Sequence, residues 1–202
     1  MAIAPYLRFA CVPDIALDNV SFKFRESTFF ERTAIHEARG LVVRGDLRGN
    51  DASMSVVADH HALLRALRDA LVEQSLPVVD ALCEWSGFAR RATWGMLTSS
   101  WASQFTGLWN DRNDQRGAGP VLDRFFEGAD VVCAMRPTMH SVERYGVVHL
   151  YQRRASCCRY YLVPGGDLCA SCPLVPHEER IRRNREWMHT LLEREGRRVG
   201  HD

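Results

Sequence analysis

The chain has 202 residues, with 26 Lys and Arg against 25 Asp and Glu, so its formal net charge is +1. This balance excludes the strongly basic character of a protein that coats nucleic acid, and equally an acidic solvating tail. Hydrophobic residues make up 46% and charged residues 25%, which is typical of a globular protein able to bury a core without disulfides. We expect a single domain over 1–202, with an N-terminal, helical part over 1–130 and a C-terminal part over 131–202.

The sequence shows no membrane-spanning or export signal. No apolar run approaches the roughly 18–20 residues that cross a bilayer, and residues 1–12 lack a charged segment followed by an apolar one. We therefore expect no transmembrane segment and a cytoplasmic location. Lys23 is the sole lysine. Coding bias is the plainer explanation of this excess of arginine, although arginine also suits oxyanion ligands.

The first half of the chain turns from irregular to helical. Short apolar pieces at 6–12 and 41–43, broken by proline and glycine, predict loops and a few strands over 1–55. Apolar residues at helical spacing behind Asp59 predict a helix over about 60–74 with Asp59 as its N-cap. Ser75 is then expected to cap a second helix, with Pro77 in its first turn and an inner face of Val78, Val79, Leu82 and Trp85.

The middle of the chain carries the clearest helix. Large apolar residues recur at one face over about 90–109, namely Trp94, Leu97, Trp101, Phe105 and Leu108. The tryptophans among them, with Trp109, are more simply core than ligand contacts. Residues 110–119 are polar and glycine-bearing, which predicts a loop, and 120–126 can form a short helix.

The C-terminal third begins as extended chain. Residues 131–134 and 146–152 are expected to be strands, and a terminal helix is expected over about 177–195. The predicted fold class is therefore α+β, a mainly helical body with a small β-sheet before a cysteine loop and a terminal helix. His149 and His177 flank that loop, and we expect both to be surface or hydrogen-bonded histidines; His60 and His61 are expected to be exposed.

Four of the seven cysteines, Cys157, Cys158, Cys169 and Cys172, fall within sixteen residues. Their pattern is Cys-Cys, ten residues, then Cys-x-x-Cys, with a Pro-Gly-Gly turn between the pairs. Such a turn lets the chain double back so that the pairs can face one another. A two-residue gap brings both thiolates of the second pair to one side of a tight turn, as in metal sites.

Three explanations of the cluster compete. Disulfides are disfavoured because nothing indicates export and a vicinal bridge is strained. A structural zinc site with four thiolates is more serious, although zinc ligands in a pair are usually two to four residues apart. A [2Fe-2S] cluster wants two thiolates on each iron, which a set divided two and two supplies. Cys157 and Cys158 point in opposite directions in extended chain, so each can serve a different iron if the backbone bends there.

The segment from Arg153 to Leu174 resembles the C-terminal cluster-binding segment of the FhuF-like siderophore-iron reductases. The Cys-Cys-x10-Cys-x2-Cys signature of that family is matched residue for residue and differs from ferredoxin and zinc-ribbon spacings. A weaker likeness covers the Trp94–Gly95 helix, whereas residues 1–55 carry none.

The resemblance implies that Cys157, Cys158, Cys169 and Cys172 bind a [2Fe-2S] cluster. It also implies one-electron reduction of Fe(III) to Fe(II) in a siderophore, typically a hydroxamate, inside the cytoplasm, with no catalytic residue beyond the cluster. Arg153, Arg154 and Arg159 flank the cysteines and are expected to tune the cluster or dock the siderophore.

The sequence also bears on the electron donor and on alternative functions. No dinucleotide or flavin fingerprint is present, so a small redox protein or a diffusible reductant is expected to donate the electron. Two alternatives remain. One is a cluster-containing sensor, against which stand the near-neutral charge and the lack of a basic recognition helix, so that no nucleic-acid partner is expected. The other is a non-catalytic protein with a structural zinc site made by the four cysteines.

Overall fold

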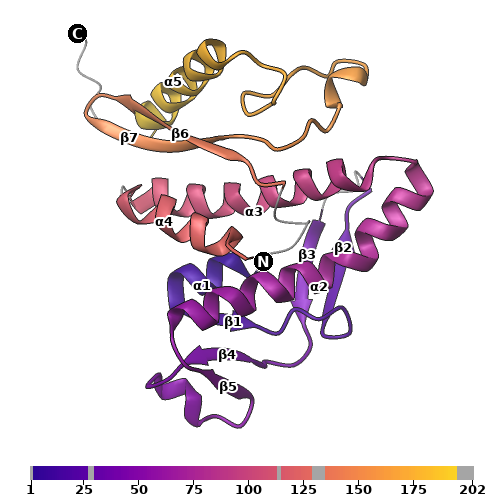
Figure 1. The fold of residues 1–202 in the computed structure, drawn as a ribbon, viewed down its shortest axis with the longest axis vertical. Helices are drawn as coiled ribbons and strands as arrows, with labels where there is room; N and C mark the ends of the chain where they lie inside the picture. The colour runs from indigo at the N-terminus through magenta and orange to yellow at the C-terminus, as the bar shows by residue number, and fades with distance from the viewer. Residues whose placement is uncertain (1, 27–29, 113–114, 129–134, 195–202) are drawn as a thin grey trace. The chain divides into compact units, whose positions relative to one another are not determined.

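A computed structural model describes residues 2–26, 30–112, 115–128 and 135–194 (Figure 1). Helices and small sheets alternate, which confirms the α+β class and the terminal helix. The chain falls into two compact units, Met1–Ser86 and Gly87–Asp202. The boundary between these units lies between Ser86 and Gly87. The single domain over 1–202 and its division at residue 130 stay predictions.

The first unit joins short strands to one long helix. It contains α1 (Ile3–Phe9), β1 (Cys11–Pro13), β2 (Val20–Phe24), β3 (Phe30–Ile35), β4 (Gly40–Val43), η1 (Leu47–Asn50), β5 (Met54–Val57) and α2 (His60–Ser86). One sheet has the order β1-β4-β5, antiparallel then parallel, and β2 and β3 form a hairpin. The strands confirm the expectation for 1–55, whereas α1 was not predicted. Ile3, Val42, Leu63 and Leu67 are fully buried and form the core.

The predicted break at Ser75 is wrong, because α2 is one helix with Pro77 inside it. A proline there removes one backbone hydrogen bond and crowds the carbonyl of residue 73. Leu71 and Val79, on either side of it, are both buried, and that burial favours continuing the helix. Val79 alone of the expected inner face is buried, since Trp85 is 85% exposed.

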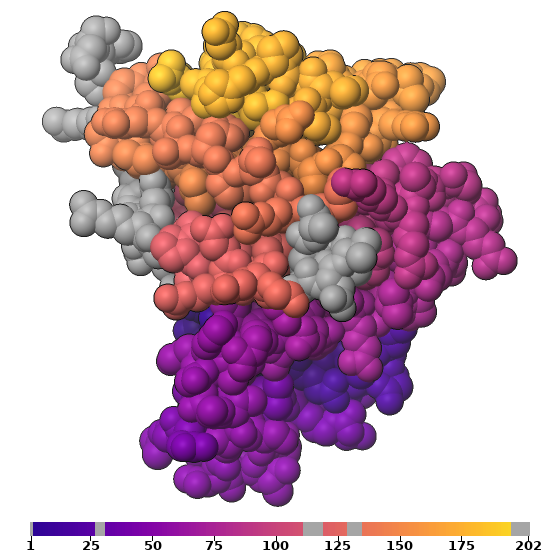
Figure 2. Space-filling model, viewed as in Figure 1, coloured from indigo at the N-terminus to yellow at the C-terminus, as the bar shows by residue number. Residues whose placement is uncertain are grey.

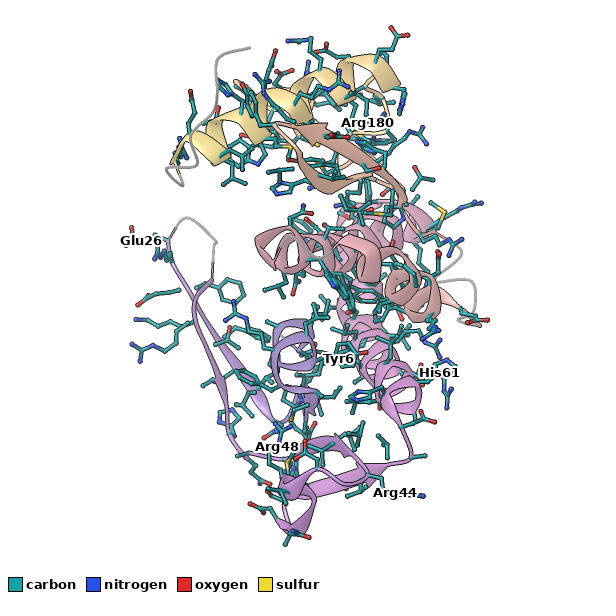
Figure 3. All side chains as sticks on the ribbon, turned by 90° about the vertical axis from the view of Figure 1, so that its left-hand side faces the viewer. Tyr6, Glu26, Arg44, Arg48, His61 and Arg180 are labelled. Atoms are coloured by element: carbon teal, nitrogen blue, oxygen red, sulfur yellow. The ribbon has the colours of Figure 1, made fainter. Side chains whose placement is uncertain are left out.

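The N-terminus of α2 is as predicted. The Asp59 carboxylate accepts a hydrogen bond from the Ala62 N–H at 2.7 Å, so Asp59 caps the helix. Backbone hydrogen bonds chiefly from Ala62 hold the pKa of Asp59 below its usual value. His60 and His61 are both exposed at the same end, where Figure 3 labels His61.

In the second unit, α3 (Arg90–Arg112) and α4 (Gln115–Phe126) share an aromatic core. Trp94 and Trp101 are both 4% exposed, and Phe105 and Phe125 are fully buried with ring centroids 5.0 Å apart. The helix over 90–109 and the core role of its tryptophans are confirmed.

The predicted loop over 110–119 is wrong where the structure describes it. Helix α3 continues to Arg112 and α4 already begins at Gln115, with Pro120 inside it. Phe125 packs edge-on against Trp101, with centroids 6.2 Å apart. Tertiary packing of this kind outweighs the low helix propensity of the glycines and the proline.

A hairpin of β6 (Thr138–Arg144) and β7 (Val147–Arg153) leads to the cysteines, and α5 (His177–Arg194) packs on it. Tyr145 and Gly146 both have positive φ, at 53° and 70°, as a two-residue hairpin turn of the primed type requires. Val142, Met188 and Leu192 form the buried contact, and the atoms of hairpin and helix make one continuous surface (Figure 2).

The remaining predicted strands and the predicted terminal helix agree only in part with the structure. Strand 146–152 and the terminal helix are confirmed, β6 was not predicted, and the expected strand 131–134 lies outside the described residues. Among the helices that the structure describes, none is long and apolar enough to cross a membrane.

At Leu150 the free edge of β7 is closed by one side chain. Asn110 on α3 donates from Nδ2 to the Leu150 carbonyl at 2.9 Å, and its Oδ1 accepts from the Leu150 N–H at 2.8 Å. The Asn110→Ala substitution should lower the free energy of unfolding by about 1–3 kcal/mol, because it leaves a backbone donor and acceptor unpaired. Urea denaturation measures this. Asn50→Ala, at an exposed residue, should stay within about 0.5 kcal/mol of wild type.

His140 on β6 makes stability depend on pH. Burial first, then the charges of Arg180 and His177, lower the pKa of His140 to about 4; Asn184 and Tyr151 contact the same ring. Above about pH 6.5 the histidine is neutral in both states and stability is full. As pH falls from 6.5 toward 4, the unfolded chain takes up a proton that the folded one resists, so about 2 kcal/mol is lost. In the His140→Gln variant this part of the pH dependence should disappear, and in His61→Gln it should remain; an equal slope in all three proteins contradicts the assignment.

Candidate metal centre

The cysteine segment, residues 154–176, has little regular structure and is fastened to α3 at its beginning. The Ser156 Oγ donates to the Ala92 carbonyl at 2.6 Å, and the Ala155 N–H donates to the Ser99 Oγ at 3.0 Å. Gly95 lies between these anchors, and a Cβ there would stand 2.9 Å from the Ser156 Oγ. Glycine is therefore what lets α3 approach the residue before Cys157.

The segment then turns back on itself. The 3₁₀ turn η2 (Tyr160–Leu162) follows Arg159, whose φ is 59°, and Gly165 has a φ of 75°. A Cβ on Gly166 would overlap the Tyr160 carbonyl oxygen, so this residue must be glycine. The predicted Pro-Gly-Gly reversal is confirmed, and it brings the second cysteine pair back beside the first.

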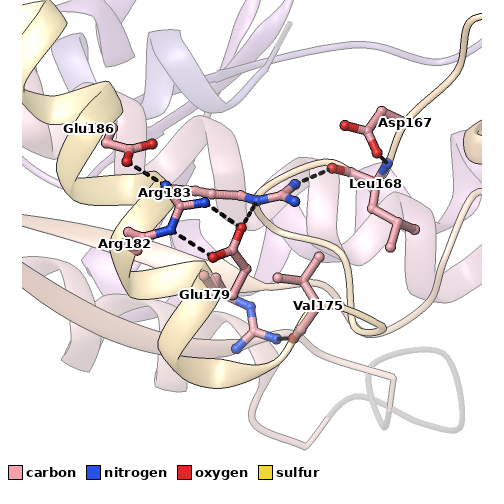
Figure 4. A network of polar contacts seen from close by, with 8 residues as sticks. Asp167, Leu168, Val175, Glu179, Arg182, Arg183 and Glu186 are labelled. Carbon is pink, nitrogen blue, oxygen red and sulfur yellow. Dashed lines mark hydrogen bonds and ion pairs between the residues drawn. The ribbon is translucent and has the colours of Figure 1, made fainter.

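Helix α5 holds the returning half. Figure 4 shows Arg183 donating from Nη1 to the Leu168 carbonyl at 2.7 Å, next to Cys169. Glu179 accepts from Arg183 and Arg182, which lowers the pKa of the Glu179 carboxyl to about 2 and keeps it ionised. The buried Arg180, labelled in Figure 3, donates to the carbonyls of Val175 and of Cys172, the latter at 3.4 Å.

All four predicted cysteines line one cavity of about 210 Å³, which we call the cysteine cavity. Cys172 is buried, Cys157 is half-buried, and Cys158 and Cys169 are exposed. The Sγ atoms of Cys157 and Cys172 are 3.5 Å apart. Burial and the neighbouring Cys157 thiol raise the pKa of Cys172. The structure thus brings together both pairs that the sequence pattern predicted to face one another.

Hydrogen-bond donors surround the sulfurs. The Arg159 N–H lies 3.3 Å from the Cys157 Sγ, the Leu174 N–H bonds the Cys172 Sγ, and the Ser171 Oγ lies 3.5 Å from the Cys169 Sγ. Within the described ranges no three His, Cys, Asp or Glu side chains are gathered tightly enough to hold a metal ion.

The residues nevertheless fit a metal centre. The distance of 3.5 Å between the Cys157 and Cys172 sulfurs is close to the roughly 3.8 Å between two thiolates on one tetrahedral ion with bonds of about 2.3 Å. The cavity volume of about 210 Å³ is several times the roughly 30 Å³ that one water molecule occupies. The cavity therefore has room for a core of two metal ions and two sulfides.

The three predicted arginines lie differently. Arg154 is half-buried in the wall of the cysteine cavity. Arg159 is exposed, and its guanidinium lies 5.4 Å from the centre of the Phe88 ring. Arg153 is exposed and donates to the Pro173 carbonyl at 3.2 Å. Arg154 and Arg159 lie within the cysteine segment, and Arg153 directly precedes it.

The two predicted histidines do not line the cysteine cavity, and two anchor residues of α3 were not predicted. His177 is exposed, and His149 is 4% exposed and lines a second, larger cavity. The anchors Gly95 and Ser99 were not predicted, because a contact between residues 56 or more positions apart leaves no local pattern. The small residues Ala92, Gly95 and Ser99 share one face of α3 and indicate a close approach, but they do not indicate which distant segment packs there.

Comparison with known proteins addresses this segment alone. The family model described as the FhuF 2Fe-2S C-terminal domain matches residues 154–174. Comparison with curated proteins and with solved structures gave no match. The matched residues contain the four cysteines and the turn between them, and the model's description supports an iron-sulfur centre.

Two glycines of α3 give a matched test of the anchor. Gly95→Ala gains the helix propensity of alanine but places a methyl group against Ser156, whereas a Cβ at Gly107 meets nothing within 4 Å. Gly107→Ala should therefore stabilise the protein by about 0.5–1 kcal/mol, and Gly95→Ala should be less stable than Gly107→Ala by about 1–3 kcal/mol. Thermal melting of both variants checks this; equal melting temperatures contradict the close approach.

Proposed function

We propose that this protein is a [2Fe-2S] ferric-siderophore reductase of the FhuF-like family, with Cys157, Cys158, Cys169 and Cys172 as the cluster ligands. The observation that supports it most directly is that four cysteines in this spacing line one cavity that opens to the surface. The match of residues 154–174 to a 2Fe-2S domain model supports the same cofactor.

The sulfur geometry favours one division of the ligands. Cys157 and Cys172 are close enough to share one iron, which leaves the exposed Cys158 and Cys169 for the other. The vicinal cysteines would then serve different irons, and the left-handed φ of 59° at Arg159 turns the chain directly after this pair. In this arrangement the more buried cysteines, Cys157 and Cys172, would hold one iron, and the two exposed cysteines would hold the other.

A [2Fe-2S] cluster held by these cysteines would supply the transfer of one electron to ferric iron in a chelate. Fe(III) is a hard ion held by anionic oxygens, and adding one electron lowers its charge and weakens those bonds. Reduction therefore releases the iron. The electron enters from a donor and leaves to Fe(III), so neither a proton nor a nucleophile is needed at the site.

The chain's own residues determine how easily a bound cluster would be reduced. The N–H groups of Arg159 and Leu174 donate to Cys157 and Cys172 and stabilise added negative charge on those sulfurs. The positive charge of Arg154 in the cavity wall acts in the same direction. Both effects favour the reduced state.

The substrate and the donor follow from the same resemblance. We propose a hydroxamate-type ferric siderophore as substrate, a small redox protein or a diffusible reductant as donor, and the cytoplasm as the location. Because Cys158 and Cys169 are exposed, a donor could approach from solvent the part of the cluster that they would hold.

The experiment that tests this function compares Cys169→Ser with Cys83→Ser after anaerobic purification. Cys169 is exposed, so its replacement should leave the fold intact, which circular dichroism verifies. We expect Cys169→Ser to lose at least about ninety per cent of the visible absorption and of the rate at which a ferric trihydroxamate reoxidises the reduced protein. The rate is followed with a chromogenic Fe(II) chelator.

Cys83, half-buried in α2 outside the cysteine cavity, is the matched control and should keep both signals. Wild-type protein that is colourless and retains one zinc per chain would contradict the proposal and support the structural zinc site. A coloured protein that ferric trihydroxamate fails to reoxidise would contradict the activity alone.

A further inference from the structure

A second cavity of about 770 Å³ lies beside the cysteine cavity within the same compact unit. Its walls come from α3, β7, α5 and the Cys169–Cys172 turn. The volume falls in the range of about 300–1,000 Å³ that small-molecule sites occupy. We call it the large cavity.

The two cavities share a wall. Arg154 lines both of them, and Ala170 and Ser171, which lie between Cys169 and Cys172 in the sequence, line the large cavity. A molecule in the large cavity therefore lies across Arg154 and the Cys169–Cys172 turn from the cysteine cavity.

The wall contains polar atoms without a partner. Tyr151 Oη, Gln152 Oε1 and Arg154 Nε are shut off from solvent and make no hydrogen bond within the described part of the chain. Gln152 is only 7% exposed. Buried polar groups nearly always find a partner, so three unpaired ones on residues that line one cavity favour a polar ligand that these side chains turn to meet. Burial raises the pKa of Tyr151 to about 12, which keeps its hydroxyl a donor.

The strand edge adds backbone groups. Leu150 directs its N–H and C=O to Asn110, and the Arg154 N–H bonds the Ser171 carbonyl, so alternate residues of β7 point away from β6. The same alternation directs the N–H and C=O of Gln152 toward the large cavity, which Gln152 lines. Trp187 and Leu191 supply apolar surface opposite.

We propose that the large cavity binds the ferric trihydroxamate chelate, an inference that rests on the proposed function and names its substrate site. Such a chelate is rich in carbonyl and N–O oxygens that accept from Tyr151 and Arg154, and its amide N–H groups match the Gln152 side-chain oxygen. Bound there, its iron lies beside the turn that carries two of the four cysteines.

Gly107 of α3 allows the large cavity to be filled without disturbing the core. This residue lines the cavity, and a Cβ on it meets nothing within 4 Å. Gly107→Phe should lower the affinity for a gallium(III) trihydroxamate at least about tenfold, measured by titration calorimetry. Ga³⁺ carries the charge of Fe³⁺ and is not reduced, so binding is read independently of electron transfer.

The matched control is Gly119→Phe. Gly119 is also a helical glycine of this unit whose Cβ would meet nothing within 4 Å, and it lies outside the large cavity. Its variant should bind like wild type. Tyr151→Phe removes an unpaired buried hydroxyl, so it should raise the melting temperature while lowering affinity about tenfold, a combination that a purely structural residue does not give.

Either of two results overturns the cavity proposal: wild-type protein that does not bind the gallium complex, or Gly107→Phe that binds it as tightly as wild type. The visible spectrum of the same samples separates this from the proposed function. A colourless protein with Gly107-dependent binding defeats the reductase and keeps the cavity. A coloured protein whose Gly107→Phe variant reduces the ferric complex at the wild-type rate defeats the cavity alone.

Discussion

The close contact between α3 and the start of the cysteine segment is the constraint on which the candidate metal centre depends. Residues 154–176 have almost no secondary structure of their own, so their shape is set by what they touch. Gly95 removes the Cβ that would block the approach, and Ser99 and Ala92 supply the hydrogen-bonding groups. Helix α3 is long and packs in an aromatic core, and these contacts fix the position of a segment that carries four cysteine sulfurs.

The contacts from α5 complete this hold from the other side. Arg180 and Arg183 both donate to backbone carbonyls, and Arg183 also pairs with Glu179, because the planar guanidinium offers several donors in fixed directions. The arginine excess of the sequence therefore has a structural use here, separate from any role in attracting an anionic ligand. No lysine ammonium group is present in this unit, because Lys23 lies in the other one.

Local pattern predicted the parts of the fold that local chemistry determines. The Asp59 cap, the aromatic stripe of α3, strand β7 and the terminal helix all follow from periodicity or capping and are confirmed. The errors at Ser75 and over 110–119 have one cause: proline and glycine were given more weight than the burial of Val79 and Phe125. The facing of the cysteine pairs was predictable from the reversal between them, whereas the large cavity was not, since its walls are far apart in the sequence.

The Asn110 amide has a consequence beyond the stability of the hairpin. A two-stranded ribbon has two open edges, and an open edge can pair with a strand from another molecule and start aggregation. On β7 the outward groups of Leu150 are taken by Asn110 and the N–H of Arg154 by Ser171, so the positions on either side of Gln152 are closed to a passing strand. The backbone of Gln152 is therefore left open to a small molecule. A strand from another chain cannot pair along this edge of β7.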